Sequence, residues 1–139
     1  MAIPRKMPIE FRTVFPYGAF MVGEVTPVRD YDRSTRENPV QQLDPETELP
    51  LWQVEVVDAD PDATKATRTM AVKVAAKVQP VPPPAQDGVP FRPVEFDRMT
   101  ATAYIEEKGD FRKIVYSLRA SGVREPGKAN KPGMEKAAA

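Results

Sequence analysis

Proline makes up sixteen of the 139 residues, and this proportion limits the regular structure that the chain can form. Proline has no backbone N–H and a fixed φ, so it interrupts helices and central strands wherever it falls. Six prolines lie in residues 78–93, and this composition predicts a stiff, extended, polyproline-like segment. The chain is long enough for one domain with a modest core. We therefore expect short elements joined by loops and no long helix.

Alternating apolar and polar residues predict β-strands. In residues 51–58, Trp52, Val54 and Val56 fall on one face, which indicates a half-buried strand with Trp52 in the core. Gly23 and Pro27 predict a bulge or an edge in the first strand. In the last strand, the inward face is predicted to carry Ile114, Tyr116, Leu118 and Ala120. Five strands are expected, over residues 17–28, 51–58, 69–75, 99–105 and 111–120.

An all-β fold follows, and five strands around one small core favour a closed or nearly closed sheet. We expect a five-stranded, OB-like, partly open barrel with long loops over residues 1–124, and a disordered basic tail over 125–139. A small sandwich or another barrel is the alternative. Residues 29–50 are polar and are expected to form a long loop or a loose hairpin tip.

The chain contains neither cysteine nor histidine. Thiol nucleophiles, thiolate metal sites and histidine general bases are therefore excluded, which leaves carboxylate–Mg²⁺ chemistry, lysine chemistry or no chemistry. Of these we expect the last, with no enzymatic activity and no cofactor. Asp58, Asp60 and Asp62 have the spacing that opens a calcium loop. The glycine and glutamate that complete such a loop are missing, which favours a simple turn. No stretch approaches the ~20 apolar residues of a membrane span, so a cytoplasmic protein without a membrane partner is expected.

Charge is unevenly distributed although the net charge is zero. Residues 24–62 carry a net charge of −8 and residues 111–139 a net charge of +5. Residues 29–36 interleave arginines with Tyr31, a pattern suited to phosphate contact and base stacking. The alternative is a solvated loop whose arginines pair with neighbouring carboxylates. The predicted nucleic-acid-binding residues are Arg29, Tyr31, Arg33, Arg36, Lys73, Lys77, Arg92, Tyr104, Lys113 and Arg119.

Seven separate segments carry a resemblance to a known family: residues 14–20, 22–28, 32–36, 50–61, 78–83, 90–96 and 117–122. They resemble small actinobacterial proteins named as plasmid replication, integration and excision activators. The resemblance covers roughly residues 10–125, and it implies a role in switching on replication and excision of a mobile element, without catalysis. The strand layout is also similar to that of small phage single-stranded-DNA-binding proteins, which are OB-like dimers; this second likeness is an analogy of fold only.

Two functions are therefore expected from different classes. The first is a single-stranded-DNA-binding module that supports replication of a mobile element, with salt-sensitive binding. The second is a protein-interaction adaptor that recruits a replication initiator or a recombinase through the acidic residues 37–62 and the proline-rich loop. A duplex-binding activator ranks last because no helix-turn-helix pattern is present. A homodimer is expected because a small open barrel leaves edges to pair.

Overall fold

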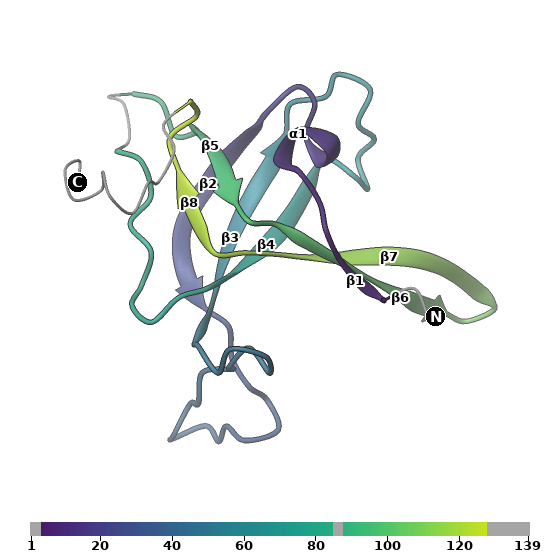
Figure 1. Cartoon of the computed structure of the whole chain (residues 1–139). Helices are drawn as coiled ribbons and strands as arrows, with labels where there is room; N and C mark the ends of the chain where they lie inside the picture. The colour runs from purple at the N-terminus through teal and green to yellow at the C-terminus, as the bar shows by residue number, and fades with distance from the viewer. Residues whose placement is uncertain (1–3, 85–87, 128–139) are drawn as a thin grey trace.

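The computed structural model describes residues 4–84 and 88–127 of the chain (Figure 1). Within these residues the fold is all-β, as predicted, with a single short helix. The elements are β1 (Lys6–Pro8), α1 (Phe11–Val14), β2 (Ala19–Pro27), β3 (Leu51–Asp58), β4 (Thr69–Ala75), β5 (Arg92–Asp97), β6 (Thr100–Lys108), β7 (Phe111–Ala120) and β8 (Gly122–Arg124).

The eight strands form one open sheet in the order β1-β6-β7-β4-β3-β2-β5-β8. Neighbouring strands are antiparallel except β4 and β7, which run parallel. Five strands were predicted, and β1, β5 and β8 are additional. The closed or nearly closed barrel is not confirmed, because β1 and β8 form the two edges of the sheet. Residues 128–139 of the predicted tail lie outside the described residues.

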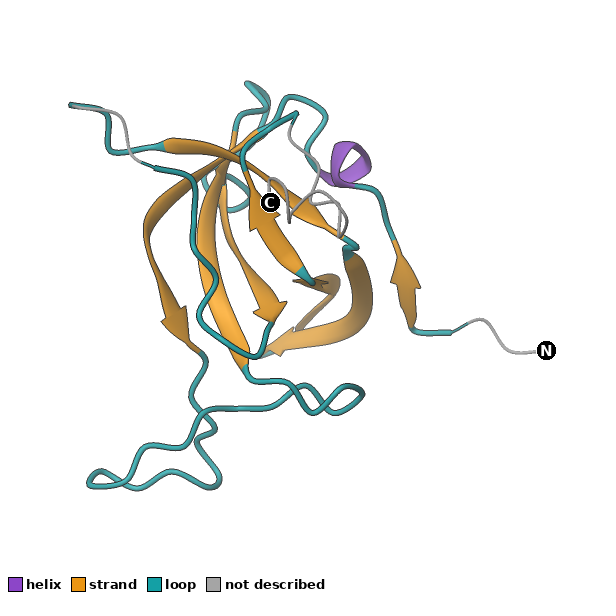
Figure 2. Cartoon of the chain, turned by 60° about the vertical axis from the view of Figure 1, so that its left-hand side comes forward, coloured by secondary structure: helices purple, strands orange, loops and turns teal. Residues whose placement is uncertain are grey.

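The sheet curves strongly, and its concave side encloses the core (Figure 2). Val54 and Val56 of β3 and Val72 and Val74 of β4 are fully buried, as their alternation predicted. Trp52 lies at the rim of this core, where its indole Nε1 donates a hydrogen bond to the Ala76 carbonyl at 3.0 Å. The other core side chains are Phe15, Ala19, Met21, Val25, Val94, Phe96, Met99, Ala101, Leu118, Ala120 and Val123.

The β6–β7 hairpin extends away from the rest of the sheet (Figure 1). Leu118 and Ala120 at its base are buried, as predicted. Ile114 and Tyr116 lie on the same face of β7 but are 66% and 63% exposed. Their predicted burial is therefore wrong, because the alternation of β7 continues past the point where the hairpin leaves the body of the sheet.

The predicted irregularity in β2 is confirmed. The pairing of β2 with β3 shifts register between Val22 and Thr26, and Gly23 within this shift has φ +72°.

An added Cβ at Gly23 meets no atom within 4 Å, so only backbone strain opposes a larger residue. We expect Gly23→Ala to lower the free energy of unfolding by about 1–2 kcal/mol, the penalty of the left-handed region. Urea unfolding measures this difference, and an unchanged midpoint would contradict the strain.

The β2–β3 loop (residues 28–50) is the long loop that was one of the two predicted alternatives, and its own hydrogen bonds order it. Isolated bridges join Arg29 to Gln41 and Leu43 to Pro50. The Gln41 side chain donates to the Leu51 carbonyl at 2.7 Å. Leu51 lies on the outer side of β3 yet is fully buried. The loop therefore packs against the end of β3.

The aspartates that follow β3 form the predicted turn. The Asp58 carboxylate accepts the Asp60 amide N–H at 3.0 Å, and the Asp60 carboxylate accepts the Asp62 amide N–H at 2.9 Å. These bonds use the carboxylates to order the backbone. Over residues 4–84 and 88–127, no group of three or more His, Cys, Asp or Glu side chains could hold a metal ion.

Candidate nucleic-acid interface

Polar side chains form a row across one face of four neighbouring strands, β3, β4, β7 and β6. Lys73 of β4 is in register with Arg119 of β7 on one side and with Gln53 of β3 on the other. Arg119 is also opposite Thr100 of β6. The residues before and after Lys73 are fully buried, so alternation directs Lys73 to the convex side of the sheet. Two cations therefore lie side by side on one sheet face.

Burial and the neighbouring like charge both affect the ammonium group of Lys73. Its pKa is lowered from the ordinary value of 10.5, first because burial disfavours the ammonium and second because of the positive charge of Arg119. Among the described residues no ion pair joins Lys73 to a carboxylate. An anion placed between the two side chains would stabilise both charges.

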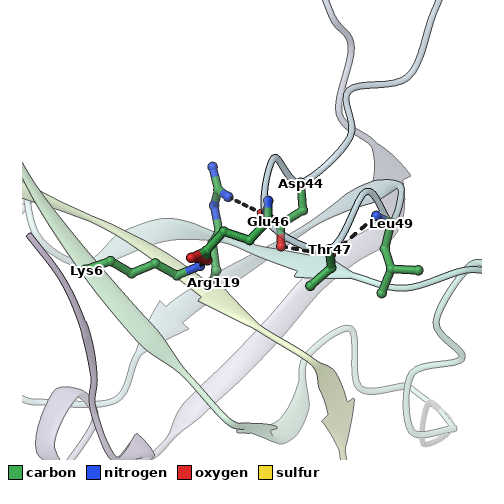
Figure 3. Close-up of polar contacts among 6 residues, drawn as sticks. All are labelled: Lys6, Asp44, Glu46, Thr47, Leu49 and Arg119. Atoms are coloured by element: carbon green, nitrogen blue, oxygen red, sulfur yellow. Dashed lines mark hydrogen bonds and ion pairs between the residues drawn. The ribbon is translucent and has the colours of Figure 1, made fainter.

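The β2–β3 loop supplies one such anion. Asp44 is 4% exposed, and its Oδ1 accepts a hydrogen bond from Arg119 Nη1 at 2.9 Å. The second oxygen of Asp44 accepts the Thr47 hydroxyl at 3.1 Å. Glu46 forms an ion pair with Lys6 of β1, so the loop contacts this face of the sheet at two points (Figure 3). An acidic loop thus lies over part of the cationic face.

The face that carries Lys73 and Arg119 continues along the β6–β7 hairpin. Tyr104 of β6 lies opposite Val115 and is 44% exposed. Lys113 of β7 lies opposite Glu106, and the Lys113 Nζ is 3.7 Å from the Glu106 Oε1. Lys73, Tyr104, Lys113 and Arg119 therefore share one face, which we call the outer face. Lys6 joins them and was missed, because its strand has only three residues between Pro4 and the end at Pro8 and shows no alternation.

The four predicted residues of the first loop lie on a separate protrusion. Tyr31 is 80% exposed, and the Arg29 guanidinium carbon is 5.6 Å from the centroid of its ring. Arg29 donates to the Thr35 carbonyl at 3.0 Å, and Arg33 and Arg36 are exposed. Asp30 accepts backbone amide N–H groups of its own turn. This loop joins β2 to β3 and includes the Asp44 segment described above.

The remaining two predicted residues are placed elsewhere. Lys77 is exposed just after β4. Arg92 begins β5 and donates to the Pro83 carbonyl at 3.5 Å. In the sheet order β3 and β2 separate β5 from β4, so Arg92 does not join the row formed by Lys73 and Arg119. The predicted set therefore divides among the outer face, the β2–β3 loop and these two separate positions.

A second charged cluster connects β5 with β8. Arg124 binds Glu95 at 2.7 Å and Asp97 at 2.6 Å. Burial acts to lower the pKa of Arg124, but hydrogen bonds and charge from Asp97 and Glu95 outweigh it, so the pKa is raised. Arg124 of β8 thus forms ion pairs with two carboxylates of β5. These ion pairs hold β8 against β5.

No family model, curated protein or solved structure matches this chain. No helix among residues 4–84 and 88–127 has the length and apolar character needed to cross a membrane.

Proposed function

We propose that the protein is a non-catalytic, single-stranded-DNA-binding accessory protein and that its outer face is the binding surface. The observation that carries the proposal is the cross-strand pair of Lys73 and Arg119, in which Arg119 binds the carboxylate of Asp44 in the β2–β3 loop. In this arrangement Asp44 stands in for a nucleic-acid phosphate. Arginine and lysine neutralise phosphates, and the exposed ring of Tyr104 on the same face offers a surface for base stacking.

The strand pairings support an OB-like barrel as part of this proposal. Strands β5 and β6 are separated only by Arg98 and Met99. Counted as one bent strand, they pair with β2 at one end and with β7 at the other. The pairings then run from β2 through β3, β4, β7 and β6–β5 back to β2. Such a five-membered ring is what a small, partly open barrel requires.

This assignment gives the loops a role. An OB-fold binds oligonucleotides on its second and third strands, between the loop after the first strand and the loop before the last. Those strands correspond to β3 and β4, and those loops to the β2–β3 loop and the tip of the β6–β7 hairpin. Arg29, Tyr31, Arg33 and Arg36 would then contact the strand from the flank, whereas Lys73 and Arg119 would contact it at the centre.

The first test is fluorescence anisotropy of a labelled ~30-nucleotide single strand at low and high salt, with a duplex of the same length as the control. We expect binding that favours the single strand and weakens as salt increases, because phosphate contacts release counterions. Equal affinity for the duplex would contradict the single-strand proposal. Absence of binding to either form at low salt would overturn DNA binding altogether.

The acidic segment of the β2–β3 loop is expected to compete with DNA for the outer face. Glu46→Gln removes the carboxylate that pairs with Lys6 and keeps the size of the side chain. We expect the affinity for the single strand to rise about two- to fivefold, since an exposed ion pair contributes ~0.2–1 kcal/mol. The matched control is Glu24→Gln, an exposed carboxylate on β2. Equal effects of the two changes in anisotropy titrations would contradict competition at Lys6.

The resemblance to plasmid replication, integration and excision activators supplies the biological setting of the proposal. A protein that holds single strands would assist replication or excision of a plasmid or integrative element, where such strands form. The proposed role places the protein in the cytoplasm with the DNA of the element.

An adaptor that recruits an initiator or a recombinase is the second candidate function, and one observation favours it. Val78 and Val81 on the proline-rich segment are 73% and 85% exposed. Exposed apolar side chains on a stiff, extended segment suit recognition by an aromatic-lined groove. A pull-down with the initiator and recombinase of the same element tests this role. Capture that is lost in Val78→Lys and Val81→Lys would favour the adaptor over the DNA-binding role.

A further inference from the structure

One face of the β6–β7 hairpin is apolar and has no partner among the described residues. In the register of the hairpin, Ala103 lies opposite Tyr116 and Ile105 lies opposite Ile114. Ile105, Ile114 and Tyr116 are 65%, 66% and 63% exposed. Met7 of β1 is on the same side of the sheet and is 44% exposed. We call these five residues the arm face.

The arm face is a direct continuation of the core. Next to it toward the body of the sheet, the pair Ala101 and Leu118 is buried. Monomeric proteins rarely expose a contiguous apolar patch of more than a few hundred Å². A tyrosine ring beside two isoleucines and a methionine reaches that size, since one aromatic side chain alone buries ~150–250 Å². A patch of this extent indicates an interface.

The shape beside the arm face is complementary to the arm itself. A groove of about 760 Å³ lies between the inner half of the hairpin and the body, and its lining includes Met7, Val14, Met70, Ala103 and Tyr116. On this side β6 carries the small residues Ala101 and Ala103 in the inner half of the hairpin, whereas the outer half carries Ile105 of β6 and Ile114 of β7. The groove therefore has the apolar character that the outer half needs in a partner.

We propose that the arm face binds the arm face of a second copy of this chain about a two-fold axis. Each hairpin would place its outer isoleucines, Ile105 and Ile114, over the groove and the alanines of the other. Such an interface is isologous, because the same patch serves both partners. Facing sheets pack ~10 Å apart, a spacing at which the side chains of the two arms can interdigitate.

Charge at the end of the hairpin fits an identical partner. Glu107 pairs with Arg112 at 3.2 Å, and Glu106 pairs with Lys113 at 3.7 Å. The carboxylates and cations of the tip are equal in number, so two copies do not repel one another. Three acidic and three basic residues form this tip: Glu106, Glu107, Lys108, Asp110, Arg112 and Lys113. The dimer does not depend on DNA binding, because Tyr104 and Arg119 lie on the opposite face of the hairpin.

Sedimentation equilibrium from ~1 to ~100 μM tests the dimer in the absence of DNA. We expect a reversible dimer of the wild-type chain. The double variant Ile105→Lys with Ile114→Glu keeps a favourable cross-strand pair, and both side chains are exposed in one copy, so each chain should still fold. We expect its dimer dissociation constant to rise at least about thirtyfold, as for removal of interface hot spots. Val81→Lys, an exposed apolar residue elsewhere, is the matched control and should leave the dimer unchanged.

Cross-linking tests the two-fold arrangement directly, since the chain has no cysteine of its own. A tagged Ala103→Cys chain mixed with an untagged Ile114→Cys chain should form a heterodimer with a short bismaleimide. A Lys65→Cys chain, exposed on the β3–β4 turn, should not cross-link with either. A wild-type chain that is monomeric at every concentration would overturn the proposal. So would a double variant that remains dimeric, or a cross-link between positions 103 and 114 of different chains that forms only when DNA is added.

Discussion

Replacement of Lys73 by glutamate is expected to weaken binding to a 30-nucleotide single strand by more than about tenfold, without loss of the fold. Lys73 lies at the centre of the outer face beside Arg119, so a negative charge there opposes a phosphate directly. The pKa of Lys73 is lowered in the folded chain, which means that the charged lysine opposes folding. This opposition is complete below the folded pKa and disappears as the pH rises to the unfolded value near 10.5. At pH 7 the carboxylate of the variant lies beside Arg119 in place of a second cation, so the variant should keep its melting temperature while it loses DNA.

Two further variants make this prediction specific. Lys65→Glu makes the same change of charge on the exposed β3–β4 turn and should reduce affinity far less. Lys73→Gln removes one phosphate contact and should make the slope of log K against log salt about 0.7 less steep. Equal losses of affinity in the Lys65 and Lys73 variants would indicate a general effect of net charge, which would contradict a site at Lys73.

Phe15→Ala is expected to have the largest effect on stability, lowering the free energy of unfolding by about 3–5 kcal/mol. Phe15 is fully buried between α1 and β2, and its ring centroid is 5.2 Å from that of Phe11. The sheet curves around this end of the core, so neighbouring strands are not free to collapse into the cavity. Urea unfolding at equilibrium measures the difference, with the slope m showing whether the transition remains two-state.

Phe20→Ala provides the control for this prediction. Phe20 has the same side chain five residues later, but it is 38% exposed on the outer side of β2. We expect a loss of about 1 kcal/mol or less there, because the removed ring leaves a surface depression instead of a cavity. Similar losses at Phe15 and Phe20 would contradict the packing role assigned to Phe15.

Local alternation was sufficient to predict the long strands. Leu51–Asp58, Thr69–Ala75 and Phe111–Ala120 were predicted with the bounds that the structure gives. The three missed strands lack that signal. β1 and β8 have three residues each, too few for a period of two to be recognised, and β5 contains Pro93, which argues against a strand.

Local alternation predicts on which face of a strand a side chain lies, but it does not predict which strands are neighbours in the sheet. The candidate site could therefore be predicted only in part. The alternation of β7 correctly directs Arg119 outward. The placement of Arg119 beside Lys73 depends on the parallel pairing of β4 with β7, which no local pattern encodes. The contact between Arg119 and Asp44 joins residues 75 positions apart. The exposure of Ile114 and Tyr116 likewise depends on where the hairpin leaves the body of the sheet.

The parallel pairing of β4 with β7 also has a consequence for how the chain is made. The pairings β2–β3, β3–β4 and β6–β7 join strands that follow one another in the sequence, so each can form soon after both of its strands leave the ribosome. Val72–Val74 must instead wait for Leu118–Ala120, which follow several seconds later at about 5–20 residues per second. During that interval the edge of β4 is unpaired and able to add a strand from another nascent chain. Because non-local pairing of this kind is slow, the fraction of chains that reach the native state should depend on translation speed and on chaperones that cover this edge.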